Sequence, residues 1–165
     1  MPHTNFELTL VFALIGPAYL VAVGWPLART DIREYRLPNR LVLPGFAYSL
    51  VGQLLAGVLG NWQLIQALAL GLATFALGLF ANTRQVLGMG DVKLAALISL
   101  NLGWFAPIYA GVALVGALAL AGATALGAVS LGRNVLGKRI ALGPYLLAGF
   151  ALALMLALAT AVGGS

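Results

Sequence analysis

The sequence predicts an all-α protein, folded as one integral membrane bundle of six transmembrane helices. The first observation is composition: 62% of the 165 residues are hydrophobic and only 8% are charged. A typical soluble domain is about 25% charged, so this chain has too few charges to cover its apolar surface in water. The other two observations are six long apolar stretches and a one-sided distribution of Lys and Arg. We therefore treat residues 1–165 as a single transmembrane domain.

The six predicted spans follow from length, because a bilayer core of about 30 Å needs about 20 apolar helical residues. They are Leu8–Ala28, Leu41–Leu59, Trp62–Ala81, Asp91–Leu102, Pro107–Leu131 and Gly143–Val162. The fourth is the shortest, and we expect it to tilt or to enter the membrane only part-way.

Proline and glycine mark the expected breaks between and within these spans. Pro107 and Pro144 are placed at helix starts, where the missing N–H costs nothing, and Gly60–Asn61 is expected to form a tight turn. Pro17 and Pro26 lie inside the first span and are expected to kink or end it. An end at Trp25–Pro26 leaves the backbone that approaches Asp31 irregular.

The fifth span carries alanine at every fourth position. Small residues on one helix face let membrane helices approach closely, so this face is expected to pack against another helix. The alanines are Ala113, Ala117, Ala121 and Ala125.

All nine basic side chains fall on one side of the predicted bundle. They are Arg29, Arg33, Arg36, Arg40, Arg84, Lys93, Arg133, Lys138 and Arg139. Lys and Arg are enriched in cytoplasmic loops, so this side is predicted to be cytosolic and both termini extracytoplasmic, as an even number of spans requires. Topology and contact with anionic lipid headgroups explain the net charge of +5 better than nucleic acid does.

The chemistry-bearing residues are few. The chain has no cysteine and one histidine, His3, so we expect no disulfide, no metal site and no cofactor. The four acidic residues are Glu7, Asp31, Glu34 and Asp91. Asp31 follows the first span and Asp91 opens the fourth, which places both on the predicted cytosolic side.

Each aspartate taken alone has an ordinary explanation. Asp91 is placed to cap the start of a helix, and Asp31 is placed to pair with Arg33 or Arg36 in a wet loop. Together, however, two close carboxyls can share one proton. The ionised member then activates a water while the protonated member donates to a scissile carbonyl, as in an aspartic protease.

Two glycines precede Asp91. Gly88 and Gly90 allow backbone conformations closed to other residues and leave room for an extended substrate beside the carboxyl. A plain loop-to-helix turn explains them equally well.

The two aspartate segments together resemble type IV prepilin peptidases, which are membrane aspartic proteases of the GxGD type. The first motif begins at Asp31 and ends at Pro38–Asn39; the second is Gly88-Met89-Gly90-Asp91-Val92-Lys93. A third segment, Gly143–Gly149, resembles a less specific stretch near the last span. The resemblance covers nearly all of the chain, and the order of the motifs fits.

The resemblance implies that Asp31 and Asp91 are the catalytic pair. Gly88, Gly90 and Lys93 would support Asp91, and Pro38 and Asn39 would fix the loop after Asp31. The implied reaction, in a prokaryotic cytoplasmic membrane and without a cofactor, is hydrolysis of one peptide bond. That bond joins a basic leader to the hydrophobic helix of a prepilin or pseudopilin. Glu34, the one remaining acid on that side, is the candidate to attract the leader.

The sequence also departs from the family. Many relatives carry an insertion with paired cysteines and N-methylate the new terminus; this chain resembles the shorter, peptidase-only members. Ala141–Leu142 stands where the family often has Pro-Phe. Two other functions stay open: a small proton-coupled carrier or channel that uses both aspartates as relay groups, and a non-catalytic component of a secretion machine.

Overall fold

The computed structural model describes residues 2–58, 63–131 and 141–163. Within these ranges every regular element is a helix, which confirms the all-α class. The helices are α1 (Pro2–Ala13), α2 (Ile15–Glu34), α3 (Asn39–Val58), α4 (Gln63–Thr83), α5 (Met89–Gly103), α6 (Pro107–Ser130) and α7 (Gly143–Gly163). The predicted turn at Gly60–Asn61 lies outside the described residues.

The helices α1 and α2 follow each other with a break at Leu14. Pro17 explains this break, because it has no N–H to donate to the carbonyl of Ala13, and the predicted effect of Pro17 is confirmed. Hydrogen bonds on either side keep the path nearly helical: Leu14 donates to Leu10 O at 3.0 Å and Ala18 donates to Leu14 O at 2.8 Å.

The expected end at Trp25–Pro26 is wrong. Helix α2 continues through Pro26 to Glu34, and the Thr30 hydroxyl donates to the Pro26 carbonyl at 2.8 Å. A proline that faces outward costs one backbone bond, which the packing of the rest of the helix offsets. Asp31 is therefore held in the last turn of a regular helix.

In the described part of the chain, five helical segments are long and apolar enough to cross a membrane. They are Glu7–Glu34, Asn39–Val58, Gln63–Thr83, Pro107–Ser130 and Gly143–Ala161. The remaining predicted span corresponds to α5, whose 15 residues reach only about 22 Å at ~1.5 Å per residue. The predicted count of six spans is therefore not confirmed, and the fourth is short, as expected.

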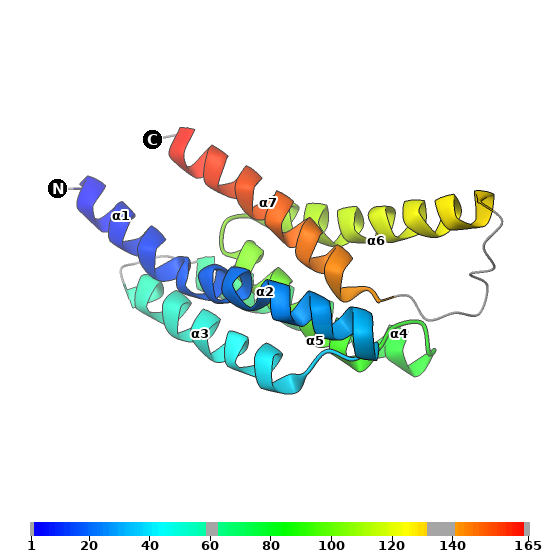
Figure 1. The fold of residues 1–165 in the computed structure, drawn as a ribbon. Coiled ribbons are helices and arrows are strands. Elements are labelled where there is room, and N and C mark those ends of the chain that lie inside the picture. Colours follow the sequence, from blue (N-terminus) through cyan, green and yellow to red (C-terminus); the bar gives the residue numbers. More distant parts are fainter. Residues whose placement is uncertain (1, 59–62, 132–140, 164–165) are drawn as a thin grey trace.

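Helix α5 is short because it is enclosed by protein. Every residue from Ala96 to Gly103 is buried, and α5 packs against α3, α4, α6 and α7. A helix surrounded by other helices does not have to match the lipid thickness. Figure 1 shows α5 crossing the middle of the bundle.

The two ends of the bundle differ. The start of α1 and the end of α7 lie at one end, whereas the end of α2 and the starts of α3 and α5 lie at the other (Figure 1). Asp31 and Asp91 belong to this second end. The six basic residues that the structure describes also belong to it: Arg29, Arg33, Arg36, Arg40, Arg84 and Lys93. Arg133, Lys138 and Arg139 lie outside the described residues.

Helices α6 and α7 pack closely through small residues. Ala113, Ala117 and Ala121 are buried, and a Cβ added to Gly149 of α7 would meet the carbonyl oxygen of Ala113. The packing role predicted for the alanine face is confirmed. This contact sets the position of α7, whose first residue reaches the candidate site.

Candidate active site

Asp31 is a buried carboxyl beside the start of α7. Its side chain is 4% exposed, and its Oδ2 accepts a hydrogen bond from the backbone N–H of Gly143 at 2.8 Å. The positive end of a helix dipole and its free N–H groups favour a negative charge. The start of α7 therefore stabilises the ionised form of Asp31.

The ordinary explanation for Asp31, an ion pair with nearby arginine, has no support among the described residues. Arg33 and Arg36 are exposed, and the polar partner of the Asp31 carboxyl is Gly143. The chain instead turns away after α2 at Tyr35, which has a left-handed φ of 51°.

Asp91 lies in the first turn of α5, and the N-cap residue of that helix is Gly88. The expectation that Asp91 itself is the cap is therefore wrong by three positions. Its carboxyl forms a hydrogen bond with the backbone of Gly88, as an acid at the third helical position commonly does. A Cβ on Gly88 would lie 3.0 Å from Asp91 Oδ2, so this glycine leaves room for the carboxyl.

The two carboxyls interact electrostatically. Burial, together with the charge of Asp31, raises the pKa of Asp91 to about 6, although the hydrogen bond with Gly88 lowers it. Asp91 belongs to α5, outside the five spanning segments. Two residues that are 60 positions apart in the sequence are thus brought within electrostatic reach at one end of the bundle.

Leu37 fills the space between the two helix starts. It is 8% exposed, and a Cβ on Gly90 would lie 2.9 Å from Leu37 Cβ. A Cβ on Gly143 would lie 3.2 Å from Leu37 Cδ2 and 2.7 Å from Asp31 Oδ2. Glycine is needed at both positions because the loop before α3 packs directly against the starts of α5 and α7.

The two predicted motifs meet through their polar residues. The Lys93 ammonium donates a hydrogen bond to Asn39 Oδ1 at 3.0 Å. The Pro38 carbonyl accepts from the N–H groups of Leu41 at 3.0 Å and Val42 at 3.3 Å, which starts α3. Lys93, Pro38 and Asn39 therefore tie the start of α3 to the start of α5.

The sequence also matches the model of a known protein family. The model of the type IV leader peptidase family matches residues 18–132. The chain belongs to the type IV leader peptidase family. The match confirms the resemblance that the two motifs indicated, and this family implies a protease. Neither curated proteins nor solved structures gave a match.

Family membership and the five apolar helices together indicate a multi-pass membrane protein. The matched range includes Asp31, Asp91 and both motifs, but it ends before Gly143. The contact between α7 and Asp31 is therefore a feature of this structure that the family match does not supply.

A further positioning residue of this leader peptidase family member escaped the sequence analysis. The Asn82 side-chain amide donates to the Leu87 carbonyl at 2.8 Å, across a turn in which Gln85 has a φ of 58°. This bond fixes the segment that precedes Gly88. An asparagine at the end of an apolar helix carries no motif signal, so only the fold reveals this contact.

Glu34, the candidate for attracting a basic leader, is the last residue of α2 and is exposed. It lies at the same end of the bundle as the two aspartates, on the helix that carries Asp31. The Glu34 carboxylate is therefore accessible to a basic group that approaches from solvent.

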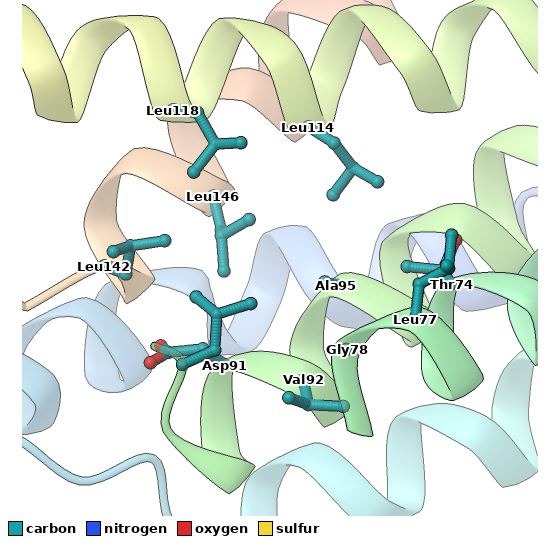
Figure 2. Close-up of a pocket in the computed structure, with 11 residues that line it drawn as sticks. Thr74, Leu77, Gly78, Asp91, Val92, Ala95, Leu114, Leu118, Leu142 and Leu146 are labelled. Carbon is teal, nitrogen blue, oxygen red and sulfur yellow. The ribbon is translucent and has the colours of Figure 1, made fainter. Parts of the chain in front are cut away.

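A cavity of about 230 Å³ lies next to Asp91, between four helices. Figure 2 shows Asp91 at one side of it and Leu114 and Leu118 of α6 across from the α5 floor. The lining residues are Thr74, Leu77, Gly78, Leu87, Asp91, Val92, Ala95, Leu114, Leu118, Leu142 and Leu146. The hydroxyl of Thr74 already donates to Ser99 Oγ at 2.9 Å. We call this cavity the Asp91 pocket.

In the described part of the chain, no three His, Cys, Asp or Glu side chains are grouped as a metal ion would need.

Proposed function

We propose that this protein is an intramembrane aspartic endopeptidase that removes the basic leader from a prepilin or pseudopilin at the cytoplasmic membrane face. One observation carries the proposal. The aspartates of the two family motifs lie at one end of the bundle, close enough for the charge of Asp31 to raise the pKa of Asp91. A carboxyl pair of this kind can hold one proton between its members.

The surroundings of the two carboxyls suggest different roles. Asp31 receives the Gly143 N–H at the start of α7, which favours its ionised form. Asp91 has a pKa raised to about 6, so a larger share of it is protonated near neutral pH than of an ordinary aspartate. Asp31 is then the base and Asp91 the acid, although the titration belongs to the pair as a unit.

The proposed reaction uses one water and no other reactant. Asp31 removes a proton from water, the water oxygen adds to the scissile carbonyl carbon, and Asp91 gives its proton to the carbonyl oxygen. The tetrahedral diol then collapses, the C–N bond breaks, and the leaving nitrogen takes the proton held by Asp31. The diol returns a proton to Asp91 as the new carboxyl group forms, so the pair ends in its starting state.

The substrate class follows from the family, whose members act on leader-bearing precursors, and from the charges at this end. A basic leader in the cytosol would meet Glu34, which is exposed at the end of α2. The neighbouring cations would contact anionic headgroups. The scissile bond would then lie where the leader joins the apolar helix, beside Asp91.

The test is cleavage of a purified prepilin by the purified protein in proteoliposomes. Asp31→Asn and Asp91→Asn should each lower turnover by about 10³-fold or more, because each removes one of the two proton-transfer roles. The Glu7→Gln variant should cleave normally, because Glu7 is an exposed acid in α1, away from the end of the bundle that holds the two aspartates. Thermal unfolding of each variant checks that it is folded.

Near-normal turnover by either aspartate variant would refute the paired mechanism. Proton flux that depends on both aspartates, without any peptide cleavage, would instead support a proton-coupled carrier.

A further inference from the structure

The Asp91 pocket is lined by α4 and α6 as well as by α5 and the start of α7. Helix α4 packs mainly on α5, and α6 packs mainly on α7, whereas α4 and α6 hardly touch each other. The side chains at the rim are open: Leu77 of α4 is 71% exposed and Leu118 of α6 is 56% exposed. Both helices are among the segments apolar enough to span a membrane, so exposed side chains between them are placed to face the hydrocarbon of the bilayer.

The pocket has the size and polarity for one large apolar side chain. Its volume is about 230 Å³, and a dry cavity of about 150 Å³ holds a benzene molecule. The hydroxyl of Thr74 donates its hydrogen to Ser99 and can only accept from an occupant, which leaves Asp91 as the ionisable group of the lining.

The carboxyl also discriminates between possible occupants. A lipid acyl chain in the pocket would bury Asp91 against groups that cannot form hydrogen bonds, which is costly. A peptide supplies amide N–H and carbonyl groups at the carboxyl and an apolar side chain for the leucines. The lining therefore fits an apolar peptide segment better than lipid.

We propose that α4 and α6 form the lateral entrance of the active site, through which the apolar segment of the substrate passes from the lipid. One of its large apolar side chains, next to the scissile bond, then occupies the Asp91 pocket. This inference rests on the proposed function and adds to it the route of entry and the subsite.

The first experiment narrows the entrance with a bulky side chain. Leu118→Trp places an indole at the rim, and we expect it to lower kcat/KM for a membrane-embedded prepilin by about tenfold or more, chiefly through a higher KM. Leu120→Trp is the matched control, because Leu120 lies on the same helix, is 46% exposed and does not line the pocket. Equal activity of the two variants would contradict the proposal.

The second experiment closes the entrance reversibly, which the absence of native cysteine makes simple. A double variant, Leu77→Cys with Leu118→Cys, is linked by a bifunctional methanethiosulfonate and later released with a reducing agent. We expect linking to lower cleavage by about tenfold or more, and reduction to restore it. The control pair, Tyr109→Cys with Thr160→Cys, joins α6 to α7 where their hydroxyls are 2.6 Å apart, and linking it should leave cleavage unchanged.

The outcomes separate the two proposals. If the linked Leu77–Leu118 variant cleaves as fast as the reduced one, the substrate enters elsewhere and the pocket belongs to lipid, while the peptidase activity stands. If the wild-type protein cleaves no prepilin, the proposed function fails first and the entrance has no substrate.

Discussion

At the scale of single residues, the two aspartates are chemically unequal. Asp31 is almost fully buried and accepts an N–H at the start of α7. Asp91 is partly exposed, borders an apolar pocket, and has a raised pKa. This difference favours the ionised form of Asp31 and raises the protonated share of Asp91, and it makes the two substitutions to Asn distinguishable in their effect on stability.

Asp91→Asn should stabilise the protein in a pH-dependent way. Since folding raises the pKa of Asp91 from 3.8 to about 6, the protonated carboxyl favours the folded state below pH 4, and this contribution is lost as pH rises through 6. The Asn variant has no charge to bury. Its Tm in detergent should match wild type near pH 4 and exceed it at pH 7.5 by roughly 2–4 °C per kcal/mol relieved. A Tm difference that is constant with pH would contradict the burial of this charge.

Gly143→Ala should impair catalysis more than folding. The new Cβ would lie 2.7 Å from Asp31 Oδ2, so α7 or the carboxyl must shift and the N–H bond is weakened. We expect kcat to fall by about tenfold or more while the unfolding temperature changes little.

The control is Gly111→Ala on α6, where nothing lies within 4 Å of an added Cβ. If Gly143→Ala cleaves at the rate of this control, the start of α7 does not position Asp31.

The sequence identified the two aspartates because their motifs are local. It could not identify Gly143 as the partner of Asp31, since the two residues are 112 positions apart. The donor is also a backbone N–H, which almost every residue type has, so the sequence does not mark it. Leu37 was missed for a related reason. A leucine in an apolar chain carries no signal, and its place between Gly90 and Gly143 exists only in the folded bundle.

At the scale of helices, hydropathy predicted which segments are helical but not which of them are enclosed by other helices. The predicted span Asp91–Leu102 corresponds closely to α5, Met89–Gly103, yet this helix is enclosed by others and is shorter than the five long apolar helices. A helix that is surrounded by other helices and a helix that faces lipid both have a predominantly apolar composition, so hydropathy does not distinguish them. Pro26 failed as a break for another reason: local propensity predicts a helix end, and tertiary packing of α2 overrides it.

The bond between Lys93 and Asn39 should couple α5 to α3. Lys93→Met and Asn39→Ala each remove the same hydrogen bond, so we expect each to lower kcat/KM by about threefold to tenfold, and the double variant to be no worse than the more impaired single variant. The magnitude is modest because this contact is solvent-exposed. Arg40→Met, which removes an exposed cation beside Asn39, is the matched control. Additive losses would show that the two residues act separately.

At the scale of the whole molecule, composition alone required a membrane, and the five long apolar helices agree. The distribution of the basic residues, together with the fold, distinguishes the two ends of the bundle. The six described cations lie at the end of the bundle that holds Asp31 and Asp91, while the start of α1, the start of α6 and the end of α7 belong to the other end. The one-sided charge predicted from the sequence thus coincides with the site.

This asymmetry predicts the orientation of the protein. Because cytoplasmic loops are enriched in Lys and Arg, the aspartate end should face the cytosol, where a basic leader would be. The chain has no cysteine, so single cysteines report sidedness without background. In intact cells, a membrane-impermeant maleimide should label Pro107→Cys, at the start of α6, and should label Arg36→Cys, in the loop after α2, only after permeabilisation. Both positions are exposed, so a difference in labelling reflects sidedness rather than burial. The reverse pattern would put the carboxyl pair on the outer side, out of reach of a cytosolic leader, and would contradict the proposed cleavage even if both aspartates proved essential.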